Sequence, residues 1–183
     1  AMFSGCSSMD SRIPDLPANL TNGRSMFEGC TKLYGHIPVL PRSLVDGTSM
    51  FRGCEKLGGS ISAFPNGLVN GESMFKGCKN LEGNIPVLPK GLTNGISMFQ
   101  GCEKLKGSVP ALPEGLVDGK AMFRGCKNLV SFNFREFPNS LANGNQMFLD
   151  CTNLSGICPL KSDKLVNYTD MYKGTSVFCE YGL

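Results

Sequence analysis

The chain of 183 residues has a formal net charge of +3 and no run of like charges, which does not indicate a nucleic-acid partner. No apolar run approaches the length of about 20 residues that a membrane-spanning helix needs. Because the chain has one histidine and no glycine-rich phosphate motif, it offers no set of unlike groups for catalysis. We therefore expect neither an enzyme, nor a bound cofactor, nor a membrane span.

A Met-Phe-x-Gly-Cys-x-x-Leu unit recurs through the whole chain at steps of 24 residues, with one step of 25. The repeats begin at Met2, Met26, Met50, Met74, Met98, Met122 and Met147, with a degraded copy at Met171. Such a period predicts a solenoid whose coils bury apolar residues against their neighbours. We expect residues 1–183 to form a single solenoid of about seven coils. Since Ala1 directly precedes a complete unit, we interpret the chain as a fragment of a longer protein.

Each repeat contains the same elements in the same order. An Asp-Gly or Asn-Gly pair, such as Asp46 and Gly47, predicts a tight turn with positive φ at one corner. Residues 49–51 contain no proline, so we place there the short parallel strands that connect successive coils. Residues 37–41 contain two prolines, which cannot donate to a ladder, and therefore predict extended or polyproline-like backbone.

The methionine of the unit has two interpretations. If Phe51 points inward from a strand, its neighbour Met50 points outward and forms a sulfur-rich stripe suited to an apolar partner. However, an apolar residue that does not vary over eight repeats is typical of a core. We therefore favour burial of the methionine column.

Seven of the nine cysteines occupy one column of the repeat: Cys6, Cys30, Cys54, Cys78, Cys102, Cys126 and Cys151. We interpret them as small buried residues whose thiols lie near turn backbone. Seven thiols cannot all pair, and the sequence has no Cys-x-x-Cys and only His36 as a further ligand, so no metal site is expected. Cys158 and Cys179 lie outside the column, and both a disulfide and two free thiols remain open for them.

The segment from Phe27 to Pro38, Phe-x-x-Cys-x-x-Leu-x-Gly-x-Ile-Pro, resembles a leucine-rich repeat. More narrowly, the Met-Phe-x-Gly-Cys-x-x-Leu unit resembles the BspA-like leucine-rich-repeat surface proteins. The resemblance implies a right-handed leucine-rich-repeat superhelix, with short parallel strands on one face and mostly loop or extended backbone on the other. It also implies an extracellular or cell-surface location and a role in adhesion or protein binding.

Charged residues gather in three columns, which lie two positions before, one position after and two positions after each cysteine. We call these columns the basic edge, because from Glu28 to Asn128 they hold eight basic and three acidic residues. The middle column alternates in sign (Glu55, Lys79, Glu103, Lys127), so its members should neutralise one another.

The other two columns of the basic edge supply the predicted binding residues, which are Arg52, Lys56, Lys76, Lys104 and Arg124. Long-range attraction suits them to an acidic protein or an acidic glycan. The alternative is a solvated face that only keeps the chain soluble.

The C-terminal repeats depart from the pattern. Residues 132–138 replace the proline-containing stretch and bring one extra residue, which predicts a bulge filled by aromatic rings; a local aromatic contact site is the alternative. After Met171, Tyr172 replaces the phenylalanine and Phe178 takes the leucine place. We therefore expect residues 165–183 to form a degenerate capping coil.

Three functions remain open at this point. The first is a protein-binding or adhesion module of a cell-surface protein that acts through its repeat surface columns. The second is a structural spacer or stalk without its own ligand, and the third is a secreted or intracellular interaction effector. Clustered exposed charges favour the first function, whereas the self-neutralising column favours the second.

Overall fold

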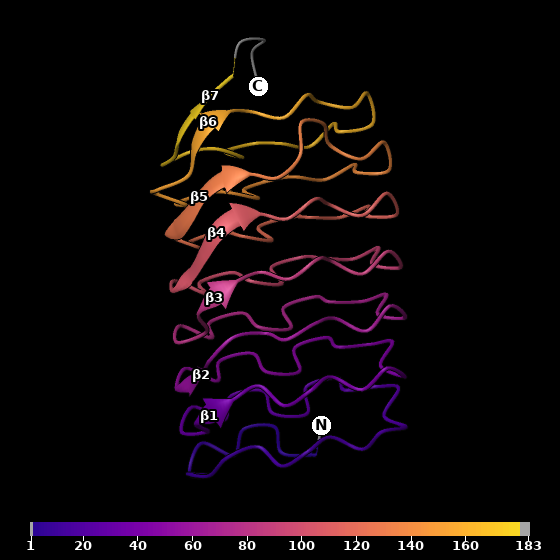
Figure 1. Ribbon diagram of the computed structural model, residues 1–183, viewed down its shortest axis with the longest axis vertical. Coiled ribbons are helices and arrows are strands. Elements are labelled where there is room, and N and C mark those ends of the chain that lie inside the picture. Colours follow the sequence, from indigo (N-terminus) through magenta and orange to yellow (C-terminus); the bar gives the residue numbers. More distant parts are fainter. Residues whose placement is uncertain (1, 180–183) are drawn as a thin grey trace.

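The computed structural model describes residues 2–179, and within that range it contains short parallel strands and no helix. The strands are β1 (Gly35–His36), β2 (Leu57–Gly58), β3 (Gly83–Asn84), β4 (Leu105–Val109), β5 (Asn128–Phe132), β6 (Ser155–Ile157) and β7 (Ser176–Phe178). They form three parallel sheets, in the orders β1-β2, β3-β4-β5 and β6-β7. Figure 1 shows the chain winding back and forth once per repeat, with the strands one above another near one edge of the stack.

The strands lie after the cysteine of each repeat, and the prediction that residues 49–51 form the strand was wrong. These residues form a turn, and Ser49 has a φ of 53°. The N–H groups of Ser49 and Phe51 do donate to the next repeat, at 2.8 and 2.9 Å. The intervening Met50 N–H instead donates to the carbonyl of Gly47 in its own repeat. The hydrogen bonds of this segment therefore go alternately to the next repeat and to its own repeat, which is not the pattern of a strand.

Gly47 is required for a different reason from the one expected. It does not have a positive φ, so the predicted left-handed turn at this position was wrong. A Cβ added at Gly47 would lie 2.8 Å from the Sδ atom of Met74 in the next repeat. Its neighbour Asp46 forms isolated parallel bridges with both Asn22 and Asn70. The Asp-Gly pair therefore forms a second ladder between repeats, and its glycine makes room for a methionine.

The core consists of columns that run along the stack. The methionines from Met50 to Met147 are fully buried, which confirms the burial of that column. The phenylalanine rings stack on one another with centroids 5.5–5.8 Å apart. The proline-containing residues 38–41 are not in a strand, as predicted. Each repeat thus buries its apolar residues chiefly against the repeats on either side.

The aromatic bulge is confirmed, although the extra residue enters earlier than residues 132–138. In the pairing of β4 with β5, Gly107 is opposite Leu129 and Ser108 is opposite Ser131, so Val130 is the inserted residue. Phe132 then packs edge-on against Phe148, with centroids 5.3 Å apart. The aromatic rings fill the core where the backbone is displaced.

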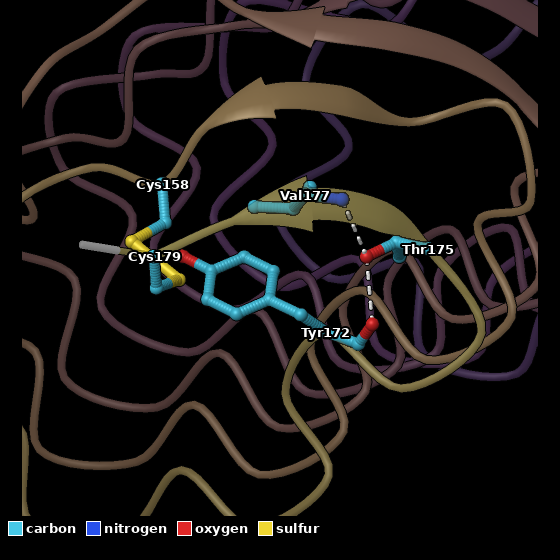
Figure 2. Close-up of a disulfide and its surroundings, with 5 residues drawn as sticks. All are labelled: Cys158, Tyr172, Thr175, Val177 and Cys179. Carbon is cyan, nitrogen blue, oxygen red and sulfur yellow. Dashed lines mark hydrogen bonds between the residues drawn. A yellow bond between two sulfur atoms is a disulfide. The ribbon is translucent and has the colours of Figure 1, made fainter. Parts of the chain in front are cut away.

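The last repeat is closed by a disulfide between Cys158 and Cys179, whose Cα atoms are 5.1 Å apart (Figure 2). Tyr172 stacks on Phe148 at 5.6 Å, as the phenylalanines do, and Figure 2 shows its hydroxyl directed toward the disulfide. That hydroxyl is buried without a hydrogen-bond partner in the described range, and burial raises the pKa of Tyr172.

Phe178 does not take the leucine place, so that prediction was wrong. The parallel pairing of β6 with β7 puts Phe178 opposite the exposed Ile157, and Phe178 is itself 64% exposed. Val177 packs against the core instead. Residues 180–183 of the predicted capping coil lie outside the described residues.

Candidate binding edge

The basic edge lies on the turn that contains each cysteine. This turn connects the methionine segment of a repeat to the strand that follows. In this turn Gly53 has a φ of 73°, which suits glycine. The Cys54 thiol donates to the carbonyl of Phe27 in the preceding repeat at 3.1 Å, and Cys78 donates to Phe51 at 3.0 Å. This confirms the interpretation of the column as buried residues beside turn backbone for the six cysteines from Cys30 to Cys151, whereas Cys6 is only partly buried.

Burial of the thiols also makes them poor nucleophiles. Burial raises the pKa of Cys54 and of Cys151 to about 12, and it raises the pKa of Cys102 well above 9.0. A thiol that stays protonated at neutral pH is a weak nucleophile and a weak metal ligand. The cysteines from Cys30 to Cys151 therefore act as packing residues of the core.

The middle column of the basic edge neutralises itself, as the sequence predicted. Lys79 lies 3.0 Å from Glu55, and Lys127 lies 3.0 Å from Glu103. All four side chains are about half exposed, so each pair contributes only about 0–1 kcal/mol to stability. These pairs occupy the two acidic residues of the middle column.

The third acidic residue of the edge is also paired. Arg52, a predicted binding residue, lies 3.2 Å from Glu28 of the preceding repeat. The other four predicted residues (Lys56, Lys76, Lys104 and Arg124) form no ion pair within residues 2–179. Lys32 of the same edge, which the prediction left out, is likewise unpaired there. The edge therefore contains five cations without a carboxylate partner in the described structure.

Two of these cations lie close enough to repel one another. Partial burial lowers the pKa of Lys76, and the like charges of Arg52 and Arg124 lower it further. Arg124 donates a hydrogen bond to the Oε1 atom of Gln146 at 3.2 Å, which holds it without neutralising it. The structure thus keeps neighbouring positive charges in place on this edge.

Other surfaces of the described chain offer less chemistry. His36 is exposed. A hollow of about 430 Å³ lies beside the proline-containing stretches and is lined by Val39, Arg42 and Phe64, among others. Arg42 is its only titratable side chain, so it contains no acid and base pair for catalysis. The part of the chain that the structure describes has no helix able to cross a membrane.

Comparison with known families now places the chain. Residues 71–168 match the BspA type Leucine rich repeat region, with six copies, and residues 1–111 match a family described as Mycoplasma protein of unknown function, DUF285. The chain belongs to the BspA-type leucine-rich-repeat family. No curated protein and no solved structure matches it.

Membership of the BspA-type family agrees with a repeat fold that has short parallel strands. Leucine-rich-repeat families are generally non-enzymatic, and this family is often surface-associated and protein-binding. In this BspA-type chain, the basic edge consists of positions that vary between repeats.

Proposed function

We propose that this chain is a non-enzymatic protein-binding and adhesion module of a cell-surface protein, which binds through the basic edge. The observation that carries the proposal is that, within residues 2–179, the three acidic residues of the edge are paired, while five of its cations are not. These cations supply a net positive field that can steer an acidic partner to the surface. The family supports both a surface location and protein binding.

The architecture that we infer for the module is a single right-handed solenoid over residues 1–183, with residues 165–183 as its cap. Parallel bridges between equivalent positions of successive repeats support this inference, as in the pairing of Asp46 with Asn70 and of Asn70 with Asn94. A right-handed path is the usual one where parallel strands are connected by a crossover. In such a solenoid the edge is a continuous surface parallel to the long axis.

A structural spacer is the second candidate, because the middle column neutralises itself through pairs such as Lys79 with Glu55. A spacer does not explain, however, why Lys56, Lys76, Lys104 and Arg124 have no carboxylate partner within residues 2–179. Like charges held together on one surface are more typical of a site whose partner supplies the opposite charge. The adhesion module therefore has the stronger support.

The test is a binding screen of the folded chain against immobilised matrix proteins and acidic glycans, at low and at physiological salt. We expect binding that weakens as salt rises, because exposed charges are screened. The double variant Lys76→Glu/Arg124→Glu should lose this binding. The control Lys90→Glu/Lys164→Glu makes the same change of net charge at exposed positions outside the edge, and should retain it. If the folded chain binds nothing in the screen, the adhesion proposal fails and the spacer is favoured.

A further inference from the structure

The unpaired cations of the basic edge are evenly distributed along the stack of repeats. One occurs in each of the five successive repeats that begin at Met26, Met50, Met74, Met98 and Met122, and in that order they are Lys32, Lys56, Lys76, Lys104 and Arg124. Repeats joined by parallel ladders are about 4.8 Å apart, so five of them span about 19 Å. The repeats follow one another along the long axis in Figure 1. The cations therefore form a linear array with one charge per repeat.

The array is kept at one charge per repeat although its members come from two columns. Where the position two after the cysteine is asparagine, as at Asn80 and Asn128, its amide donates to a backbone carbonyl of the preceding repeat at 3.0 and 2.8 Å. In those repeats the cation is at the position two before the cysteine, at Lys76 and Arg124. The two columns flank a single tight turn, so the array is long and narrow.

A long and narrow array restricts the shape of the partner. In an extended peptide, the side chains on one face are about 6.7 Å apart, which is longer than the step between repeats. Over five repeats, its acidic groups therefore shift relative to the cations by more than one repeat. An acidic patch on a globular protein spreads in two dimensions, whereas this array is two columns wide. A pyranose residue is close in length to one repeat step, so anionic groups on successive sugars can follow the array.

We propose that the basic edge binds a linear acidic polysaccharide, laid along the long axis of the stack, with sulfate or carboxylate groups facing successive repeats. This inference rests on the proposed function and specifies the ligand of the same edge. Lysine suits this role because its ammonium is a point charge on a flexible stem, which accepts an anion without fixed geometry. Four of the five cations are lysines, and Lys56 and Lys104 are exposed.

The experiment measures binding of the folded chain to heparin fragments of increasing length, with hyaluronan as a carboxylate-only chain and poly-L-glutamate as a peptide polyanion. Affinity for heparin should rise with length until the fragment spans the five repeats, and then level off. Neutralising a linear polyanion releases its condensed counterions, so log K should fall linearly with log salt, by about 0.7 for each cation engaged. Hyaluronan carries one carboxylate for every two sugars, so it should bind more weakly than heparin, and binding of equal strength would overturn the match of one anionic group to each repeat.

Two matched variants locate the contacts. Lys56→Gln/Lys76→Gln/Lys104→Gln should reduce the salt slope by about 2, since three cations are removed at about 0.7 each. The control Lys90→Gln/Lys120→Gln/Lys164→Gln removes the same charge from exposed positions outside the edge and should leave the slope unchanged. Urea unfolding of both variants shows whether each remains folded. An unchanged slope in the edge variant overturns the proposed array.

The remaining outcomes separate this inference from the adhesion proposal. If poly-L-glutamate binds as tightly as heparin, the polysaccharide inference is overturned and the adhesion proposal stands. The same holds if the chain binds a matrix protein through the edge but binds no polysaccharide. If neither polysaccharide nor protein binds the folded chain, both proposals fail.

Discussion

Gly71 lets the methionine of the next repeat lie against the backbone, so its replacement by alanine tests how the repeats pack. A Cβ added at Gly71 would lie 2.8 Å from the Sδ atom of Met98, 3.1 Å from its Cε atom and 3.3 Å from the Cδ1 atom of Leu92. These separations are shorter than the optimal distance of about 3.5–4.0 Å between non-bonded carbon atoms. Both neighbouring side chains are fully buried, so neither has open space into which it can move.

The expected cost of Gly71→Ala follows from two opposing effects. Adding a methyl group to a well-packed core costs about 1–3 kcal/mol. Because Gly71 does not have a positive φ, alanine introduces no backbone strain there, and it restricts the unfolded chain by about 0.4–1 kcal/mol in favour of folding. The net result should be a loss of about 1–2 kcal/mol in the free energy of unfolding.

Urea unfolding of Gly71→Ala and of the matched variant Gly67→Ala measures this loss. Gly67 is exposed, and the nearest atoms to a Cβ there are two carbonyl oxygens at 4.0 Å, so Gly67→Ala should be neutral or slightly stabilising. In a Met98→Ala background, which removes the two closest of these atoms, Gly71→Ala should destabilise the protein much less. Equal stability of Gly71→Ala and Gly67→Ala, or the same penalty in both Met98 backgrounds, would refute the reasoning.

Two further predictions concern the cysteines. The buried thiols whose pKa is raised by desolvation are Cys30, Cys54, Cys78, Cys102, Cys126 and Cys151. Since they titrate near 9.0 only when unfolded, their contribution to stability is complete below pH 9.0 and declines above it, by about 1.4 kcal/mol per thiol and pH unit. The urea midpoint should therefore fall steeply from pH 9 to pH 10. If the midpoint does not change over this range, and Cys78→Ala/Cys102→Ala gives the same flat profile, the prediction is contradicted. Separately, Cys158→Ser/Cys179→Ser removes a cross-link with a sequence separation of 21 and should cost about 3 kcal/mol. Hydrogen exchange should accelerate in β6 and β7 but not in β2, and equal acceleration in both regions would refute a local role.

The sequence was sufficient for the features that depend on the period. An unvarying column has the same environment in every repeat, so the burial of Met50 and Cys54 could be argued from recurrence alone. The strand position could not, because it depends on the left-handed backbone of Ser49, and serine does not signal that conformation. The role of Gly71 was missed for a related reason, since the atoms that require a glycine belong to Met98 in the following repeat.

The basic edge was predicted correctly as a set of columns, but its free charges were identified only in part. The rule that opposite charges in neighbouring repeats pair was applied to Glu55 and Lys79, and the structure agrees. The same rule applied to the adjacent column would have paired Arg52 with Glu28, because these residues have the same spacing. The sequence therefore contained the signal that pairs Arg52 with Glu28 and removes Arg52 from the predicted set.

The distribution of unpaired cations among the repeats bears on the function of the basic edge. If charged residues only kept the surface soluble, nothing would require a lysine lost at one position to be matched by a cation at another position of the same repeat. Asn80 nevertheless occurs in the same repeat as Lys76, and Asn128 occurs in the same repeat as Arg124. Partial burial and, to a smaller extent, the charges of Arg52 and Arg124 lower the pKa of Lys76, so this position is an unfavourable one for a cation. A ligand that contacts every repeat in turn accounts for both observations, whereas a ligand that contacts a single repeat accounts for neither.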